Sequence, residues 1–488
     1  MDSQHSHYRK YLERSGVIDA MSNALVKLYE SNSEKPENAI RAVRKYMCEV
    51  CPDDDHFDVM RNELEAAHRK IASLERDLER LTNQIKPTDE ELLEILEDSF
   101  KELNEDKDNG PSLLSKYLTR EVFDELIQLK TAPPNESDLL DCVKSGFQYH
   151  NSRCGVYAAD AECYDVFSTL FDPIIKDYHG QLETDAETLQ PETDYGDLDE
   201  IENLDRDRKY IQSTRIRIGR NLEGYPYFPK LNENQLTGIE KRVWAASEGL
   251  DGEHTGAYYR LDDLNMNVQE KMVNRHVLFN RGDPLLQAAG CYRFWQTGRG
   301  IFHNPAETFM IWVNEKDHVR IISIAHHGDL GDVYHRLITG LEELEKTLKF
   351  TRHRNYGFLG ACLTNLGTSL RASVHIRLPL LSQNSDSLQE KIADLNLQVR
   401  KIFGERSRSD DVVMEISNKV VIGVTEFEII KGVQDGIKEL IKAEEELEAG
   451  SGDKECGTGE YPNRMRPHVL HHILSPTFEG TECGRCAI

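Results

Sequence analysis

The spacing of apolar residues changes along the chain, and this change constrains the fold more than any other feature. Apolar residues recur at helical intervals as far as Tyr178. Beyond residue 207, short runs rich in β-branched and aromatic residues appear, such as Phe309–Val313 and residues 319–324, with loop-like residues between them. We therefore predict an α+β fold, in which a small all-helical domain precedes a larger domain with an antiparallel sheet flanked by helices.

Changes in composition predict the boundaries of the parts. Thr88 and Glu91 form a capping box ahead of an apolar run, which predicts the start of a helix. The predicted parts are a helical module at 1–87 with a coiled coil at 57–86, a small helical domain at 88–182, an acidic linker at 183–207, the larger domain at 208–447 and a disordered tail at 448–488.

The N-terminal module carries two apolar patterns of helical period. One helical face is formed by Val17, Met21, Leu25 and Leu28. A longer seam advances in steps of four and three through Met60, Leu64, Ala67, Ile71, Leu74, Leu78, Leu81 and Ile85. The positions between are mostly charged, which favours a coiled coil that joins two chains through residues 60–85. The alternative is an amphipathic helix that packs on its own domain.

The charge of the chain excludes some classes of partner. Lys and Arg total 59 against 86 Asp and Glu, a net charge of -27, which repels nucleic acid and anionic membranes. Apolar runs such as residues 420–424 are too short to span a bilayer, and the N-terminus lacks a signal-peptide core. The 10 cysteines form no small disulfide scaffold and indicate reduced thiols. We therefore expect a cytoplasmic protein.

Two C-x-x-C pairs occur, Cys48 with Cys51 and Cys483 with Cys486, and the second raises the question of a metal site. Cys483 and Cys486 form a C-x-x-C pair after His468, His471 and His472. A zinc site and a coincidence in a flexible tail both stay open there, because a single C-x-x-C without a matching half is a weak signal. No residue is assigned as a metal ligand.

Arginines in turn-flanked settings are the candidate binding residues. Arg215 and Arg217 alternate with isoleucines, so a strand would place both guanidinium groups on one face. Arg320 and Arg371 each follow a polar loop. A guanidinium fork matches phosphate oxygens, although surface ion pairs with this acidic chain are the alternative from charge alone. The sequence contains neither a P-loop nor a protein-kinase glycine loop.

Long motifs between about residues 90 and 446 resemble the phosphagen (ATP:guanidino) kinases of the arginine-kinase type. These motifs are KYLTREVFD at 116–124, LFDPIIKDYHG at 170–180, TGRGIFHN at 297–304, CLTNLGT at 362–368 and RASVHI at 371–376. The resemblance implies transfer of a phosphoryl group between ATP and a guanidino compound, with ATP or ADP bound together with Mg²⁺.

The resemblance also assigns roles to single residues. Arg215, Arg217, Arg320 and Arg371 match the arginines that grip the nucleotide phosphates. Cys362 matches the reactive cysteine beside the guanidino group. The substrate-specificity loop of the family matches Ser152, Gly155 and Tyr157, and Arg153 replaces its first glycine.

Other positions depart from the family pattern on the guanidino side. The catalytic loop keeps its first glutamate as Glu315, but Lys316 stands at its second, guanidinium-clamping glutamate. In the closing loop, an alignment without gaps places Phe403 at a phosphate-binding arginine and Arg408 at the second clamping glutamate. A shift within this irregular loop would bring Glu405 or Arg406 to these positions instead. We therefore predict a nucleotide-binding family member with impaired or lost phosphoryl transfer. The alternative is an active guanidino kinase, tethered by its N-terminal module for local ATP buffering.

The N-terminal region has a resemblance of its own. YRKYLERSGV at 8–17 and EKPENA at 34–39 are similar to the c-Myc-binding protein family, over about residues 8–86. This resemblance implies a helical dimerisation and docking module followed by a coiled coil. It also implies an amphipathic helix of an A-kinase anchoring protein as partner, and a place in ciliary or flagellar complexes.

Overall fold

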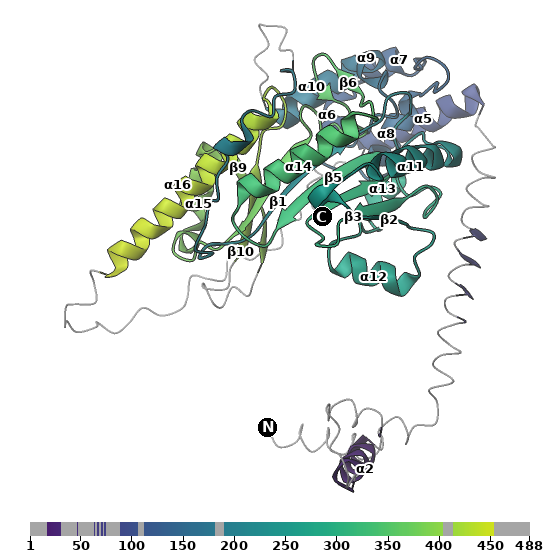
Figure 1. Cartoon of the computed structure of the whole chain (residues 1–488). Helices are drawn as coiled ribbons and strands as arrows, with labels where there is room; N and C mark the ends of the chain where they lie inside the picture. Colours follow the sequence, from purple (N-terminus) through teal and green to yellow (C-terminus); the bar gives the residue numbers. More distant parts are fainter. Residues whose placement is uncertain are drawn as a thin grey trace, which may run out of the picture. The chain divides into compact units, whose positions relative to one another are not determined.

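The computed structural model divides the chain into two compact units, Met1–Arg80 and Leu81–Ile488 (Figure 1). The structure describes residues 17–30, 46, 63, 66, 67, 70, 71, 73, 74, 88–105, 112–180, 190–403 and 413–452. Arg408, the tail beyond residue 452 and most of the predicted seam at 60–85 lie outside the described residues.

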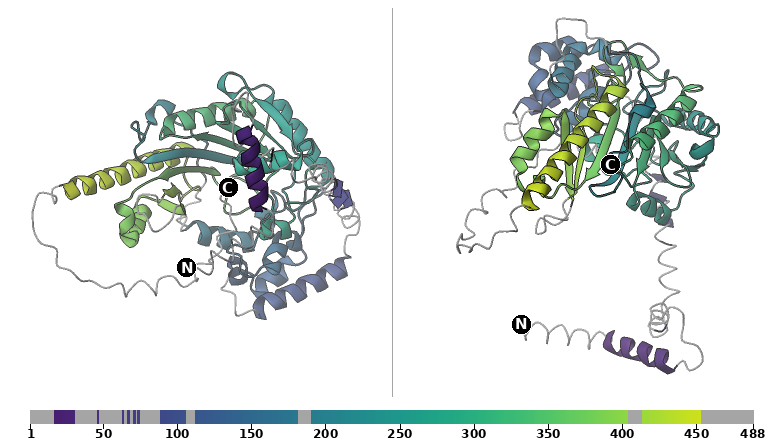
Figure 2. Two further views of the ribbon diagram at one scale, coloured as in Figure 1. Left: turned by 90° about the horizontal axis from the view of Figure 1, so that it is seen from below. Right: turned by 60° about the vertical axis from the view of Figure 1, so that its left-hand side comes forward.

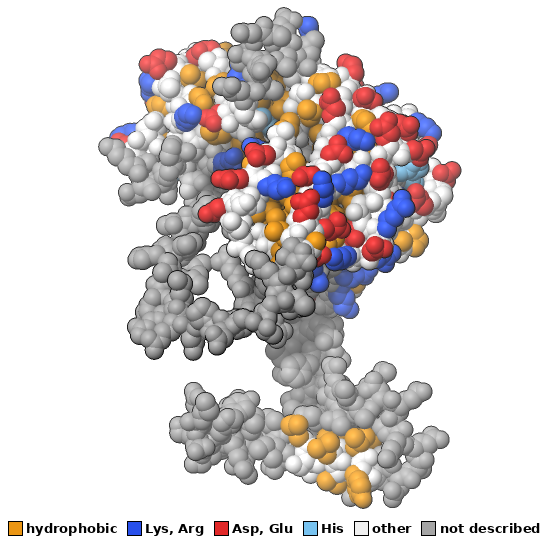
Figure 3. All heavy atoms as spheres, turned by 90° about the vertical axis from the view of Figure 1, so that its left-hand side faces the viewer, with side chains coloured by type: hydrophobic (Ala, Val, Ile, Leu, Met, Phe, Trp, Pro, Cys, Tyr) orange, Lys and Arg blue, Asp and Glu red, His pale blue; other side chains and the backbone are white. Residues whose placement is uncertain are grey.

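In the first unit, the periodicity of the N-terminal residues predicts a helix correctly. The helix α2 spans Val17–Glu30, with Ala24 buried and with Met21 and Leu25 about half exposed. Figure 3 shows the apolar side chains that gather on this helix. Ile71 and Leu74 of the seam are helical and also about half exposed within the single chain. Self-association through the seam stays a prediction.

In the second unit, an all-helical region precedes the sheet, as the sequence predicts. The capping box is present, because the Glu91 N–H donates to Thr88 Oγ1 at 3.2 Å and the Thr88 N–H donates to Glu91 Oε2 at 2.8 Å. The helices are α5 (Asp89–Glu105), α6 (Leu113–Tyr117), α7 (Arg120–Leu126), α8 (Leu139–Gln148), α9 (Cys163–Val166) and α10 (Ser168–His179).

The larger region is built on an eight-stranded antiparallel sheet, which confirms the predicted α+β fold. In spatial order its strands are β2 (Ala257–Arg260), β3 (Gly300–His303), β4 (Phe309–Val313), β5 (Val319–Ala325), β1 (Ile211–Arg220), β8 (Leu370–Ile376), β10 (Val413–Asn418) and β9 (Leu397–Phe403). The predicted pair β4 and β5 is present. A second, small sheet pairs β6 (Arg352–His353) with β7 (Gly357–Phe358).

Helices of the larger region pack against the sheet and around its edges (Figure 2). They are α11 (Glu233–Ser247), α12 (Met266–Asn274), α13 (Pro284–Ala288), α14 (Leu330–Glu345), α15 (Ser385–Asp394) and α16 (Glu426–Gly452), with 3₁₀ turns η1 (Leu198–Glu200), η2 (Gly252–His254) and η3 (Leu381–Gln383). None of the helices in the described part of the chain has both the length and the apolar character needed to cross a bilayer.

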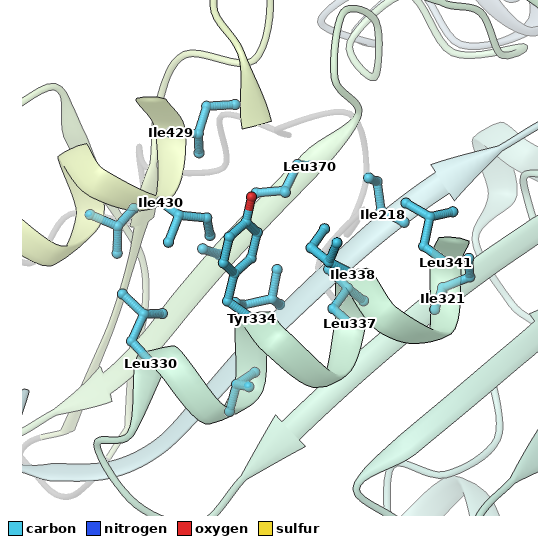
Figure 4. Close-up of a cluster of buried hydrophobic side chains, with 14 of the residues drawn as sticks. Ile218, Ile321, Leu330, Tyr334, Leu337, Ile338, Leu341, Leu370, Ile429 and Ile430 are labelled. Atoms are coloured by element: carbon cyan, nitrogen blue, oxygen red, sulfur yellow. The ribbon is translucent and has the colours of Figure 1, made fainter. Parts of the chain in front are cut away.

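The main core lies between the sheet and the helices α14 and α16. Figure 4 shows Ile218 of β1, Ile321 of β5 and Leu370 of β8 facing the side chains of these helices. Strand residues alternate in direction, so every second residue of these strands enters this core. The residues between point to the opposite face of the sheet, and the candidate site lies there.

The helical region and the sheet region are not separate globules, because they share an apolar core. Phe171 and Tyr164 of the helical region belong to the same buried cluster as Tyr227, Leu286 and Cys362 of the larger region. The Ser145 hydroxyl also donates to the carbonyl of Leu285 at 2.8 Å. This common core holds loops of both regions against each other, although the predicted boundaries between them stay predictions.

The described part of the predicted acidic linker, residues 190–207, is bonded to the larger region. The Gln190 side chain donates to the carbonyl of Val424 and accepts from the N–H of Gly423, both at 2.7 Å. Asp205 Oδ2 accepts from the N–H groups of Tyr210 and Ile211, at 2.7 and 2.6 Å. Its polar side chains therefore satisfy backbone groups of the fold, a use that composition alone did not indicate.

Candidate nucleotide and guanidino site

Three neighbouring strands present the predicted arginines on one face of the sheet. Arg217 of β1 lies opposite Arg371 of β8, and Gly219 of β1 lies opposite Arg320 of β5. Arg215 precedes Arg217 by two residues and so points to the same face. A Cβ atom at Gly219 would lie 2.7 Å from an Asp317 oxygen, so this position needs glycine for close approach. The strand register therefore assembles all four predicted phosphate-binding arginines.

The arginines of this cluster lie close enough that each positive charge makes the charged form of its neighbours less stable. Burial lowers the pKa of Arg215 to about 10, and the charge of Arg320 adds to this effect. The pKa of Arg217 is lowered well below its usual value, first by burial and then by Arg320, Arg215, Arg371 and Arg400. The Nε and Nη2 atoms of Arg215 are buried without a hydrogen-bond partner among the described residues. A phosphate that accepts hydrogen bonds from this cluster would stabilise it.

The loop between β4 and β5 carries both Glu315 and Lys316. Glu315 Oε2 lies 2.8 Å from Nη1 of Arg320, and Asp317 Oδ2 accepts from Nη2 of Arg320 at 3.1 Å. The Lys316 N–H donates to the same oxygen of Glu315 at 2.8 Å, and the Lys316 residue is 9% exposed. The retained carboxylate of this loop is therefore engaged with an arginine of the cluster.

The neutral ring of His318 holds this loop through two hydrogen bonds. The Leu222 N–H donates to Nδ1 of His318 at 3.0 Å, which assigns the ring proton to Nε2, 3.0 Å from the carbonyl oxygen of Pro226. Burial lowers the pKa of His318 to about 4. The imidazole is thus uncharged near neutral pH and acts as a structural hydrogen-bonding group.

Cys362 lies where the two regions of the second unit meet. Its Sγ is 3.0 Å from Oγ1 of Thr364, and its backbone forms a bridge with Tyr157 of the helical region. The Ala158 N–H donates to the carbonyl of Ala361 at 2.7 Å. The predicted reactive cysteine and the predicted substrate-specificity loop are therefore neighbours in the fold.

The substrate-specificity loop is held by close packing. Gly155 has a φ of +78°, and a Cβ atom there would lie 2.8 Å from Cβ of Leu114, so glycine suits both the backbone and the space. Ser152 is buried next to it. The Tyr157 ring meets the ring of Phe228 edge-on, with centroids 5.4 Å apart. Backbone pairing and packing therefore fix the positions of all three predicted loop residues.

A pocket of about 100 Å³ lies between this loop and the arginine face. Arg153, the replacement in the substrate-specificity loop, stacks its guanidinium over the Tyr178 ring at 4.7 Å and lines the pocket. The lining residues are Arg153, Tyr178, His179, Arg217, Thr364, Asn365, Arg371, Gln398, Arg400, Lys419 and Val421.

Two of the cationic pocket residues were not singled out from the sequence. Arg400 lies on β9, and Lys419 follows β10. Gln398 and Arg400 alternate along β9, so the sequence did contain a signal that they share a face. The order β8-β10-β9, which brings that face to the pocket, is a tertiary feature.

The structure brings some of the predicted site residues together and leaves the roles of others as predictions. Arg217, Arg320 and Arg371 line one small pocket on the sheet face, beside Asp317. Phe403 is the last residue of β9, and its backbone pairs with Val413. Since Arg408 lies outside the described residues, its predicted role stays a prediction.

Comparison with known proteins gives three family matches. The model of the ATP:guanido phosphotransferase C-terminal catalytic domain matches residues 238–447, and that of its N-terminal domain matches residues 108–176. A model of the c-Myc-binding protein matches residues 2–84. Both resemblances found in the sequence are therefore confirmed.

Individual relatives agree with these matches. An arginine kinase of Schistocerca americana is 48% identical over 360 residues, which cover 74% of this chain and 99% of the relative. Arginine kinase 1 of Drosophila melanogaster is 47% identical over 360 residues, with the same two shares.

Solved structures agree as well. The duplicated taurocyamine kinase of Schistosoma mansoni with bound transition-state-analogue components has a TM-score of 0.68 at 33% identity, covering 75% of this chain and 50% of that chain. A lombricine kinase has a TM-score of 0.64 at 33% identity, covering 71% of this chain and 95% of that chain. Sequence motifs, fold and relatives therefore agree that this chain belongs to the ATP:guanidino phosphotransferase family.

Proposed function

We propose that this chain binds ATP or ADP with Mg²⁺ and that its transfer of a phosphoryl group to guanidino compounds is impaired or lost. The observation that carries the proposal is the contrast between four arginines gathered on one sheet face and a lysine, Lys316, at a guanidinium-clamping position.

The arginine face supports nucleotide binding. Each charge-assisted hydrogen bond to a phosphate contributes about 1.5–3 kcal/mol, and Arg215 offers buried donor atoms that lack an acceptor among the described residues. Arg217, Arg320 and Arg371 would hold the phosphate chain together with it. The nucleotide phosphates would carry the Mg²⁺, whose charge offsets theirs. Phe403 offers no donor, so we expect weaker binding than in an active relative.

The guanidino side supports the loss of transfer. The family holds a cationic guanidinium between two carboxylates, and here the matching residues are Lys316 and, in an alignment without gaps, Arg408. Glu315 is no substitute, because it pairs with Arg320 at 2.8 Å. Two unit charges about 4 Å apart interact by roughly 4 kcal/mol at an effective dielectric near 20, so each exchange of a carboxylate for a cation reverses an interaction of that order.

Two measurements on the purified full chain test the proposal. Calorimetry with ADP and Mg²⁺ should show binding, and a coupled ADP-release assay should show no ordinary turnover with arginine, creatine or related guanidines. Absence of binding at millimolar nucleotide would remove the first half of the proposal. Ordinary turnover would instead support the alternative, an active kinase tethered for local ATP buffering.

For the N-terminal module, we propose dimerisation through residues 60–85 and docking of an amphipathic helix from an anchoring protein. The confirmed family match and the half-exposed apolar residues of α2 support this proposal. Light scattering should give a dimer for the full chain, and Leu74→Lys with Leu78→Lys should reduce it to a monomer. An unchanged mass would show that the seam is internal packing.

The same family match leads us to propose a cytoplasmic protein associated with a cilium or flagellum. A tagged full chain should concentrate in that organelle, and removal of residues 1–87 should disperse it. Equal distributions of the two proteins would contradict the proposal.

A further inference from the structure

Asn221 is a buried amide to which the candidate site assigns no role. It directly follows β1 and is 2% exposed. Its Nδ2 donates to Asp317 Oδ1 at 3.1 Å and to the carbonyl of Leu359 at 3.0 Å, and its Oδ1 accepts from the N–H of His318 at 2.9 Å. Because one end of the amide donates and the other accepts, these contacts fix its orientation.

The contacts of Asn221 join the loop of residues 314–318 to the segment that leads into Cys362. Leu359 lies three residues before this cysteine, and its N–H donates to the carbonyl of Thr351 at 3.2 Å. The backbone carbonyl of Asn221 in turn accepts from the N–H of Thr351 at 2.8 Å. One side chain therefore ties together parts of the fold that lie 96 and 138 positions away from it in the chain.

Asp317 is the link between Asn221 and the arginine face. It is 4% exposed and fits closely against two backbone segments, because Cβ atoms at Gly219 and Gly360 would lie 2.7 Å from its Oδ2 and 3.0 Å from its Oδ1. Asn221 donates to Oδ1, and Nη2 of Arg320 donates to Oδ2 at 3.1 Å. A carboxylate shared in this way binds the arginine less strongly than one that turns both oxygens towards it.

We infer that Asn221 is a positioning residue for nucleotide binding, which acts on the phosphates through Asp317 and Arg320. By holding Oδ1, the amide prevents the carboxylate from turning both oxygens towards Arg320. The guanidinium then stays on the sheet face, in the small pocket that Arg217 and Arg371 also line. Asn221 is not among the described residues that line this pocket, so it needs no phosphate contact of its own. The inference rests on the proposed nucleotide binding.

Calorimetry of the full chain with ADP and Mg²⁺ tests this inference. Asn221→Ala should weaken the affinity about tenfold, because an Asp317 oxygen loses its donor and the carboxylate turns towards Arg320. Asn221→Asp should weaken it further, since it adds a negative charge beside the same oxygen. This second variant keeps the shape of the side chain and decides the question alone if Asn221→Ala does not fold.

Asn304→Ala separates this role from a purely structural one. Asn304 is also a buried amide, 3% exposed, whose Nδ2 donates to the carbonyl of Glu253 at 3.0 Å and whose Oδ1 accepts from the N–H of Thr308 at 2.9 Å. It precedes β4, whereas the loop of residues 314–318 follows β4. Asn304→Ala should lower the free energy of unfolding but change the affinity for ADP by less than about twofold. A loss of affinity equal to that in Asn221→Ala would overturn the inference.

A double-mutant cycle identifies the route by which Asn221 acts. In Arg320→Ala the last member of the relay is missing, so the addition of Asn221→Ala should change the affinity for ADP by less than about twofold. If the two losses are fully additive, Asn221 acts through another group, and the inference is overturned.

The wild-type chain separates the failure of this inference from the failure of the proposed function. Unchanged affinity for ADP in the Asn221 variants that fold would overturn the inference while nucleotide binding stands. If the wild type binds no ADP at millimolar concentration, the proposed function fails, and the inference that rests on it fails as well.

Discussion

The two proposed halves of the site are built on different parts of the fold: strands hold the nucleotide half, and loops hold much of the guanidino half. The nucleotide half stands on β5, β1 and β8, where backbone pairing sets the spacing of Arg320, Arg217 and Arg371. The described part of the proposed guanidino half lies on loops, namely residues 314–318 and the substrate-specificity loop. Strand pairing fixes the positions of the arginines relative to one another, whereas positions on loops tolerate more variation in sequence. Under the proposed function, one scaffold keeps its nucleotide half while the charge of its substrate half changes sign relative to the family.

The largest expected effect is on arginine phosphorylation. We expect the wild-type chain to be inactive, or slower than a typical arginine kinase by roughly a thousandfold or more, because reversal of about 4 kcal/mol corresponds to such a factor. Lys316→Glu alone should restore nothing, because Arg408 and Phe403 remain. The triple change with Phe403→Arg and Arg408→Glu should recover part of the rate in a coupled ADP-release assay.

Contamination is the main confounding factor in that assay. Arg320→Ala removes a cation that both Glu315 and Asp317 contact, so any true turnover should vanish in this variant. Ordinary arginine turnover by the wild type that Arg320→Ala abolishes would show that the guanidino half is functional, and the contrast between the halves would fail.

The nucleotide half should respond strongly to loss of its arginines. Arg215→Ala with Arg371→Ala removes two charge-assisted contacts of about 1.5–3 kcal/mol each, so affinity for ADP with Mg²⁺ should fall by about a hundredfold or more. Arg275→Ala, which removes an exposed arginine paired with Glu307, is the matched control and should bind as the wild type does. Calorimetry measures all three proteins, and an unaffected double variant would contradict the assignment.

Acid should lower the stability of the fold through His318, which holds the loop of residues 314–318. His318 has a folded pKa of about 4, below the usual 6.5, so the unfolded chain binds the extra proton as pH falls. The stability due to the neutral ring is complete above about pH 6.5 and is lost progressively towards pH 4, about 3 kcal/mol in total. Denaturant unfolding at pH 7.5 and pH 5 should show the loss.

The variant His318→Gln isolates this histidine from other titrating groups. Its side chain keeps an acceptor for the Leu222 N–H and a donor for the Pro226 carbonyl, but it does not titrate. Its stability should fall less steeply between the two pH values. Identical slopes in the two proteins would rule out His318 as the source.

The smallest expected effect concerns Cys362. It contacts Thr364 and pairs with Tyr157, outside the row of phosphate-binding arginines. We therefore expect Cys362→Ala to change the affinity for ADP with Mg²⁺ by less than about twofold, because no phosphate contact is removed. A tenfold loss in calorimetry would show that the two halves are coupled through this residue.

Local sequence patterns predicted many features of the fold and of the candidate site. The alternation of Arg215 and Arg217 with isoleucines predicted which face each residue takes, because the side-chain period of a strand is two residues. The runs that became β4 and β5 and the helical face that became α2 were likewise recognisable from spacing, and the capping box predicted the start of α5. Long motifs predicted the family, which the relatives confirm.

The set of residues around the pocket between the substrate-specificity loop and the sheet depended on contacts between distant parts of the chain. By itself, the sequence determined the α+β class and the positions of single strands, because local spacing sets both. The motifs that flank Lys316 and Arg153 also predicted which positions of the family pattern these two residues occupy. Only the tertiary structure decided that Arg400 and Lys419 join Arg153 around one pocket. The reason is that strand order and domain packing place residues side by side that are far apart in the chain, and no local period records that order.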